Sequence, residues 1–182
     1  MIRIVLFFIG SLFLLYFSRR SLVNPGTHGF YRFFAFEGIL SLVLINHPHW
    51  FSRPFTLLHL LSWLLLFTSI YFVVQSLLML KKQGGHADRE EMPENHSFEN
   101  TVNVVEEGLY KYIRHPMYSS LLFLGWGAFL KQISPLTAIL VFLVTGFLIA
   151  AARVEEKENV QFFGNDYIEY MKRTKMFVPW FL

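Results

Sequence analysis

Residues 55–80 read FTLLHLLSWLLLFTSIYFVVQSLLML and contain no Asp, Glu, Lys or Arg. A transmembrane helix needs about 20 predominantly apolar residues, with a range of about 17–25. The stretch Phe55–Leu80 is therefore long enough to cross a bilayer, and its extra length favours a tilted helix. This segment alone predicts a chain that is built into a membrane.

Four more apolar stretches lie on either side of this segment. They are Ile4–Phe17, Phe33–Phe51, Pro116–Leu130 and Ser134–Ala152. The whole chain is 54% hydrophobic and only 16% charged, whereas a soluble domain is about 45–50% apolar and about 25% charged. We therefore expect an all-α integral membrane protein with about five transmembrane helices.

The predicted helices divide the chain into four parts. We expect one membrane domain over residues 1–182, because the length leaves little room for a second. Its parts are three N-terminal transmembrane helices (1–80), a loop (81–115), a helical hairpin (116–152) and a C-terminal segment (153–182).

The 16 Lys and Arg residues are unevenly distributed between alternate loops. Only Arg3, Arg53 and Lys131 lie on one side, and the first loop, the third loop and the C-terminal segment hold the others. Basic loops stay on the cytoplasmic side of a membrane. We therefore expect the N-terminus outside and the C-terminus in the cytoplasm, and this short, asymmetrically charged chain suits a prokaryotic inner membrane. Both polar segments that are large enough for chemistry then face the cytoplasm.

The motif RHPMY, residues 114–118, opens the fourth predicted helix. Proline is favoured in the first turn of a helix, where its missing N–H costs nothing. Pro116 therefore predicts the start of the helix, with Arg114 and His115 at the membrane boundary. The unpaired N–H groups and the positive dipole end of that first turn favour an anionic ligand.

A second polar cluster, Glu155 and Glu156, follows the fifth apolar stretch. The 36 residues between Tyr118 and Glu155 fit one helix out and one helix back. The hairpin therefore returns both carboxylates to the membrane face that holds His115. Two clusters far apart in sequence are predicted to form one site.

The combined pattern resembles the isoprenylcysteine carboxyl methyltransferase family, and phospholipid N-methyltransferases are similar over the same elements. The resemblance covers roughly residues 98–182, whereas the first three predicted helices match only in being apolar. It rests on Gly108-x-Tyr110-x3-Arg114-His115-Pro116-x-Tyr118, Glu155-Glu156, Phe163-Gly164-x2-Tyr167-x2-Tyr170 and Phe177-x-Pro179.

The resemblance implies an S-adenosylmethionine site without a Rossmann fold, in a cytoplasmic pocket formed by the last two membrane helices and the C-terminal segment. Carried over by position, it assigns the cofactor to Val104, Val105, Tyr110, His115, Pro116, Met117, Tyr118 and Glu155. Glu155, Glu156, Arg114 and Arg153 are the candidates for orienting or activating the methyl acceptor.

The chain departs from the family pattern at two positions. The family often has a histidine where this chain has Val102. Members that methylate a carboxylate place a substrate-contacting arginine one helical turn before the residue matching Glu155, and here that position is Ala151. Arg153 lies about 200° around a regular helix from Glu155, so either Arg153 or Arg114 would have to replace the missing arginine.

The expected acceptor is amphipathic, with an apolar part among the helices and a reactive end at the cytoplasmic boundary. A carboxylate acceptor needs no base, because the ordinary pKa of a carboxyl group is about 4, and excluding water favours its reaction with a sulfonium. An amine acceptor would need a general base, for which Glu155 or Glu156 would serve. The residues alone do not choose between the two reactions. The family resemblance favours the carboxylate and leaves a phospholipid or small-molecule amine as the alternative.

Two further classes remain as alternatives, an NADPH-dependent membrane reductase and a non-catalytic membrane scaffold. The chain has no cysteine, which excludes disulfides and thiol nucleophiles. We expect neither a metal site nor a nucleic-acid partner. Glu37 lies within the second predicted helix, and an ionisable residue at membrane depth is a functional candidate. It is predicted either to line the acceptor cavity or to pair with Arg32.

Overall fold

The computed structural model describes residues 1–52, 54–85 and 101–179. Arg53 and part of the predicted third loop, residues 86–100 with Arg89, lie outside the described residues. The helices are α1 (Ile2–Leu22), α2 (His28–Asn46), the short 3₁₀ helix η1 (His47–His49), α3 (Leu57–Gln83), the 3₁₀ helix η2 (Gly108–Lys111), α4 (Pro116–Phe129), α5 (Pro135–Phe163) and α6 (Asn165–Arg173).

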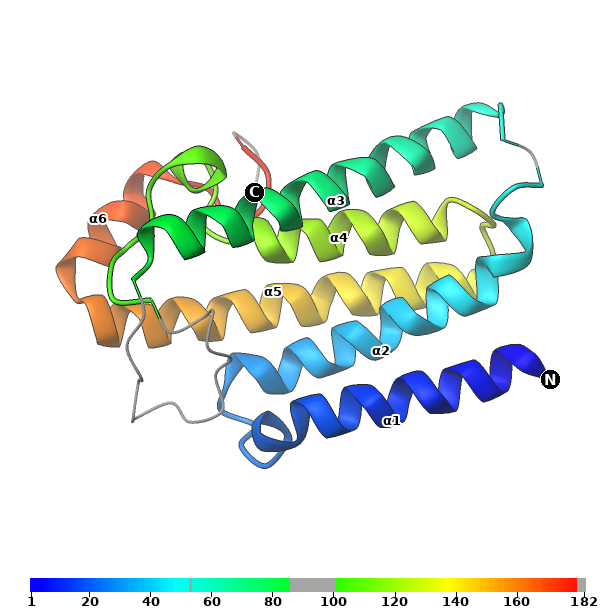
Figure 1. Cartoon of the computed structure of the whole chain (residues 1–182), viewed down its shortest axis with the longest axis horizontal. Helices are drawn as coiled ribbons and strands as arrows, with labels where there is room; N and C mark the ends of the chain where they lie inside the picture. The colour runs from blue at the N-terminus through cyan, green and yellow to red at the C-terminus, as the bar shows by residue number, and fades with distance from the viewer. Residues whose placement is uncertain (53, 86–100, 180–182) are drawn as a thin grey trace.

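Five of these helices, α1 to α5, lie side by side, and α6 and η2 gather at one end of them (Figure 1). Four of the five are long and apolar enough to cross a membrane, namely α1, α2 with η1, α3 and α5. The fourth predicted span, α4, has 14 residues, which at about 1.5 Å per residue is shorter than a hydrocarbon core of about 30 Å. The prediction of an all-α membrane protein is confirmed.

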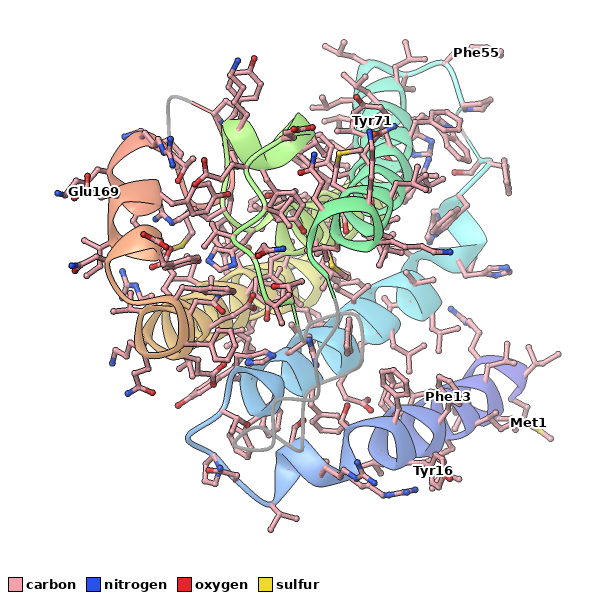
Figure 2. The ribbon with its side chains drawn as sticks, turned by 60° about the vertical axis from the view of Figure 1, so that its left-hand side comes forward. Met1, Phe13, Tyr16, Phe55, Tyr71 and Glu169 are labelled. Carbon is pink, nitrogen blue, oxygen red and sulfur yellow. The ribbon has the colours of Figure 1, made fainter. Side chains whose placement is uncertain are left out.

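The outward faces of α1 and α3 are apolar. Phe13, Tyr16 and Tyr71 lie on the outside of the bundle (Figure 2) and are 64%, 67% and 55% exposed. Large exposed apolar side chains along a helix are unfavourable in water, whereas a lipid environment accepts them. The surface of the bundle therefore fits a bilayer.

The centre of the bundle is the contact between α2 and α5, which run antiparallel (Figure 1). Gly38 of α2 approaches Val144 of α5 so closely that a Cβ atom at position 38 would lie 2.5 Å from Val144 Cγ2. Ala35 on α2 and Ala151 on α5 are fully buried in the same core. Small residues let membrane helices pack backbone to backbone, so this contact fixes how α2 and α5 are aligned.

At the end of the bundle remote from α6, Asn46 closes the end of α4. Its Nδ2 donates hydrogen bonds of 2.8, 3.3 and 3.1 Å to the carbonyls of Ala128, Phe129 and Gln132. The last carbonyls of a helix have no partner within the helix, and water is scarce beside a membrane. Asn46 adds a donor to these carbonyls, which also accept from Lys131 N, Gln132 N and Thr137 Oγ1, and it joins α2 to α4.

The fifth helix differs from its prediction in length. The apolar stretch ends at Ala152, but α5 continues without a break to Phe163. Gly164, with φ 62° and ψ −133°, ends α5, and α6 begins at the next residue. The acidic residues that follow the apolar stretch therefore lie on the rigid end of a helix.

Candidate active site

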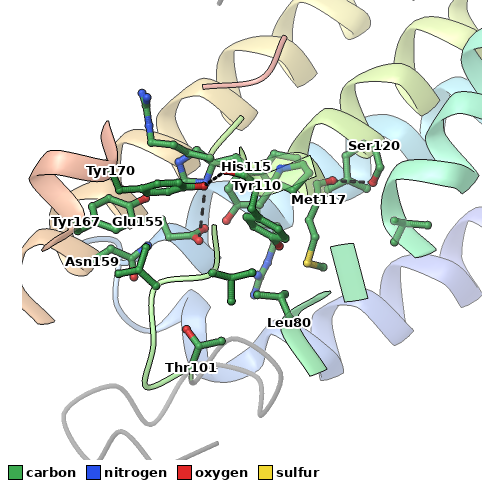
Figure 3. Close-up of a pocket in the computed structure, with 18 of the residues that line it drawn as sticks. Leu80, Thr101, Tyr110, His115, Met117, Ser120, Glu155, Asn159, Tyr167 and Tyr170 are labelled. Atoms are coloured by element: carbon green, nitrogen blue, oxygen red, sulfur yellow. Dashed lines mark hydrogen bonds and ion pairs between the residues drawn. The ribbon is translucent and has the colours of Figure 1, made fainter. Parts of the chain in front are cut away.

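A cavity of about 280 Å³ lies at the α6 end of the bundle, lined by residues of all six α-helices and of the segment 101–118 (Figure 3). It brings together the residues that the sequence assigned to a cofactor, and Arg114 with them. Those that line it are Val104, Val105, Tyr110, Arg114, His115, Pro116, Met117, Tyr118 and Glu155.

A short parallel pairing with the C-terminal segment holds the start of α4. Arg114 N donates to Lys175 O at 2.8 Å, and His115 N donates to Met176 O at 3.1 Å. Pro116 is the first residue of α4, as its helix-starting preference predicted. The backbone on both sides of His115 is therefore fixed before any ligand arrives.

His115 lies between two carboxylates from consecutive residues of α5. Its Nδ1 is 3.8 Å from Glu155 Oε1, and its Nε2 is 3.4 Å from Glu156 Oε1. Consecutive helical residues point about 100° apart, so Glu155 faces the cavity (Figure 3) while Glu156 turns toward Arg114. The ring of His115 stacks on Tyr118 with centroids 5.5 Å apart.

Arg114 binds two parts of the C-terminal third of the chain. Its Nε donates to Glu156 Oε1 at 2.6 Å, and its Nη1 donates to Met171 O at 3.3 Å and Thr174 O at 2.5 Å. Both charged side chains of the pair are only 11% exposed. Arg114 therefore docks the end of α6 against α5, and Glu156 balances its charge.

Three buried tyrosines complete the wall beside Glu155. Tyr170 Oη donates to Tyr110 O at 2.7 Å, and Tyr167 lies next to Tyr170 with ring centroids 5.6 Å apart. Burial raises the pKa of all three phenols, and the carboxylate of Glu155 raises the pKa of Tyr110 and Tyr167 further. At neutral pH they are uncharged, so they offer aromatic faces and hydroxyl groups and no phenolate.

Three sequence candidates do not line the cavity. Arg153 lies on the exposed side of α5, as the angle of about 200° from Glu155 predicted. Glu156 is turned to Arg114. Glu37 accepts a hydrogen bond of 2.7 Å from Ser11 Oγ on α1, so its structural partner lies on the neighbouring helix.

The cavity also contains residues that sequence reasoning missed. Asn159 lies one turn beyond Glu155 on α5, and both line the cavity (Figure 3). A helix extended past Ala152 would have found Asn159 by its spacing of four residues. Arg32, from the first turns of α2, also lines the cavity, and no motif in the sequence indicates this.

The apolar helices, with a cavity at one end that is lined by apolar and a few charged side chains, define an integral membrane protein with a site at the helix ends. Comparison with known proteins specifies the family. A profile described as phospholipid methyltransferase matches residues 57–166, and the chain belongs to this family. This confirms the resemblance found in the sequence.

Individual relatives fall into two named groups. A methanethiol S-methyltransferase of Pseudomonas deceptionensis is 30% identical over 128 residues, which are 70% of this chain and 46% of the relative. A protein-S-isoprenylcysteine O-methyltransferase of Saccharomyces cerevisiae is 31% identical over 93 residues, 46% of this chain and 39% of the relative. A protein-S-isoprenylcysteine O-methyltransferase B of Arabidopsis thaliana is 37% identical over 78 residues, 42% of this chain and 39% of the relative.

The chain spans less than half the length of these relatives. No solved structure matches it significantly.

Proposed function

We propose that this protein is an S-adenosylmethionine-dependent methyltransferase that acts at the cytoplasmic membrane face on an amphipathic acceptor, with a carboxylate as the methylated group. One observation carries the proposal. Every residue that the sequence assigned to the cofactor lines a single cavity, although these residues come from the segment 104–118 and from α5. Membership of a methyltransferase family supports the same conclusion.

The residues of the cavity fit the chemical groups of S-adenosylmethionine. The carboxylate of Glu155 suits an ammonium group or the hydroxyls of a ribose. The faces of Tyr110 and Tyr118 suit an adenine ring or a sulfonium cation, because aromatic faces attract cations. His115 lines the cavity with its ring stacked on Tyr118 and placed between the carboxylates of Glu155 and Glu156, so a ligand would meet an imidazole whose position is already fixed.

The size of the cavity limits what else it holds. At about 280 Å³ it lies just below the range for pockets that enclose a drug-sized ligand, about 300–1,000 Å³. It therefore has room for one such ligand and little more. This supports an acceptor that inserts only its reactive end and leaves its apolar part among the helices or in lipid.

The bound cofactor would supply an electrophilic methyl group on a positively charged sulfur. Transfer to a carboxylate breaks the sulfur–methyl bond, forms an oxygen–methyl bond and leaves a neutral ester and a neutral thioether, so no proton moves. The protein then has to align the reacting atoms and exclude water. The buried His115, the stacked Tyr118 and the Arg114–Glu156 pair give the rigid surroundings that alignment requires.

Calorimetric titration of S-adenosylmethionine into the protein in lipid nanodiscs tests the proposal. We expect saturable binding in the wild type and at least tenfold weaker binding in Glu155→Ala and His115→Ala. Glu169→Ala is the matched control, because Glu169 is 65% exposed on α6 and pairs only with Lys172 among the described residues. A folded wild type that binds no S-adenosylmethionine refutes the proposal, and binding of NADPH in its place would indicate a reductase.

A thiol is the second candidate acceptor, because relatives from Pseudomonas and Bradyrhizobium are named methanethiol S-methyltransferases. Labelled products separate the candidates once a methylated lipid extract is obtained. A methyl ester releases methanol in mild base, whereas a methyl thioether and an N-methyl amine do not. A base-stable product therefore refutes the carboxylate, and its mass distinguishes sulfur from nitrogen.

The orientation has its own test, which uses the absence of cysteine from the chain. Asn24→Cys lies in the exposed turn between α1 and α2, and Ser52→Cys lies exposed after η1. In intact bacterial cells we expect a membrane-impermeant maleimide to label Ser52→Cys only. Labelling of Asn24→Cys only would reverse the proposed orientation.

A further inference from the structure

One wall of the cavity comes from the part of the chain that the family profile does not match. Phe17 of α1 and Arg32 and Phe36 of α2 line the cavity, whereas the profile begins at residue 57. The residues assigned to the cofactor all lie between 104 and 155, inside the matched part. The named relatives share methyl transfer and differ in their acceptors, so a wall outside the shared part is where acceptor recognition is expected.

Arg32 is the charged residue of that wall. It is 7% exposed, and an ionisable residue in a membrane helix is a functional candidate. Phe36 lies one turn further along α2 and lines the same cavity. The wall therefore presents a cation next to an aromatic surface, which is the pattern for an amphipathic ligand with an anionic end.

The alignment of α2 with α5 gives the position of Arg32. His28 Nδ1 is 2.5 Å from Glu158 Oε2, and Gly38 packs against Val144. The helices are antiparallel and rise equally per residue, so a step forward along α2 matches a step backward along α5. Arg32 is four residues after His28, which places it level with Val154. It is also six residues before Gly38, which places it level with Ala150. Arg32 therefore lies level with residues 150–154 of α5, immediately before Glu155.

The other arginine of the cavity holds the C-terminal helix in place. The charge of Arg114 is balanced by Glu156 at 2.6 Å, and its Nη1 is held by two backbone carbonyls. Arg153 is on the exposed side of α5. Among the described residues of the cavity, Arg32 is the cationic side chain that comes from α2.

We infer that Arg32 binds the negatively charged reactive end of the methyl acceptor and selects anionic acceptors over amines. The inference rests on the proposed function and names the substrate class of the same site. A carboxylate and a thiolate share this chemistry, whereas a protonated amine is repelled by a guanidinium.

The test uses eight-carbon amphiphiles that differ only in their head group. Octanoate, octanol and octylamine are titrated calorimetrically into nanodisc-embedded protein saturated with S-adenosylhomocysteine. We expect octanoate to bind the wild type at least tenfold more tightly than octanol or octylamine. Octanethiol is titrated at pH 7 and at pH 10 to test whether a thiolate also binds. Only its anion is expected to bind tightly, so its affinity should be higher at pH 10.

Three variants assign the effect to Arg32. Arg32→Gln should lose the preference for octanoate, Arg32→Lys should keep part of it, and Arg19→Gln should leave it unchanged. Arg19 is exposed in the last turn of α1 and does not line the cavity, so this control removes a charge outside the cavity. The affinity for S-adenosylhomocysteine should stay within twofold in all three variants, which also shows that each is folded.

Several outcomes overturn the inference. If octanoate binds the wild type no more tightly than octanol does, the cavity has no anion site. This measurement uses only the wild type and does not depend on the folding of a variant. An unchanged octanoate preference in Arg32→Gln assigns the anion to another residue. A loss of S-adenosylhomocysteine affinity in Arg32→Gln places Arg32 in the cofactor site instead. Failure of the proposed function is distinct, because the wild type itself would then bind no S-adenosylhomocysteine.

Discussion

Replacing Arg114 by glutamine should loosen the C-terminal helix from the bundle. The Arg114 side chain is the link between the start of α4, Glu156 on α5 and the carbonyls of Met171 and Thr174 around the end of α6. A glutamine is shorter and uncharged, so it leaves Glu156 as an uncompensated carboxylate that is 11% exposed.

The expected loss follows from these contacts. Removing one partner of a buried ion pair costs about 3–5 kcal/mol, and the slight exposure of the Arg114–Glu156 pair favours the lower end of that range. We therefore expect Arg114→Gln to lower the free energy of unfolding by about 3 kcal/mol. Arg114→Gln/Glu156→Gln should lose less than the sum of the single changes, because the double variant buries no unpaired charge.

Two assays measure the effect. Unfolding by sodium dodecyl sulfate in mixed micelles reports the global free energy, and limited trypsin cleavage after Lys172 and Arg173 reports local opening of α6. Glu169→Gln is the matched control, because it breaks an ion pair of the same 2.6 Å length that is 65% exposed on both sides, and such pairs contribute about 0–1 kcal/mol. If Arg114→Gln unfolds within about 0.5 kcal/mol of the wild type and α6 is cleaved no faster, the argument is wrong.

Three further predictions concern parts of the structure outside that pair. Asn46→Ala should lower the free energy of unfolding by about 1–3 kcal/mol, because it removes a buried amide that donates to three carbonyls at and just after the end of α4. S-adenosylmethionine affinity should stay unchanged, and a weakened affinity would contradict the separation of this end from the cavity. Burial raises the pKa of Tyr167 and Tyr170, so the unfolded chain loses these phenolic protons first. The thermal midpoint should therefore not depend on these groups below about pH 10 and should fall as the pH rises above it. The fall should be less steep in Tyr170→Phe than in the wild type, and equal slopes in the two proteins would refute this. Gly164→Ala should cost about 1–3 kcal/mol in thermal or denaturant unfolding, because φ is 62° there and no atom lies within 4 Å of the added Cβ; an unchanged midpoint would mean that the link between α5 and α6 adapts freely.

Hydropathy predicted which segments form membrane helices more accurately than it predicted where those helices end. Pro116 begins α4 as expected, because its ring determines both the backbone angle and the missing donor. The prediction ended the fifth helix at Ala152, where the apolar residues end. The polar residues that follow continue α5 to Phe163, since Glu, Lys and Gln are good helix formers and hydropathy reports the boundary of the membrane and not the end of the helix.

The candidate site was predictable where one chain segment or one hairpin determined it. The motif at 114–118 and the carboxylate of Glu155 meet because α4 runs out and the longer α5 runs back past the start of α4. The place of Arg32 depends on the packing of α2 along α5, which follows from contacts such as Gly38 on Val144 that no local pattern encodes. The 3.4 Å approach of Glu156 to His115 depends in the same way on the exact rotation of α5.

The unbroken course of α5 sets the depth at which the carboxylate of Glu155 is held. From Pro135 to Glu155 the helix rises about 30 Å at 1.5 Å per residue, which equals the usual thickness of the hydrocarbon core. A rigid helix of this length couples the position of Glu155 to bilayer thickness. In lipids with longer acyl chains Glu155 would lie below the headgroups, and in thinner bilayers it would lie above the reach of a short acceptor. Turnover is then expected to peak at one acyl-chain length, so the composition of the surrounding lipid would regulate the enzyme without binding to it.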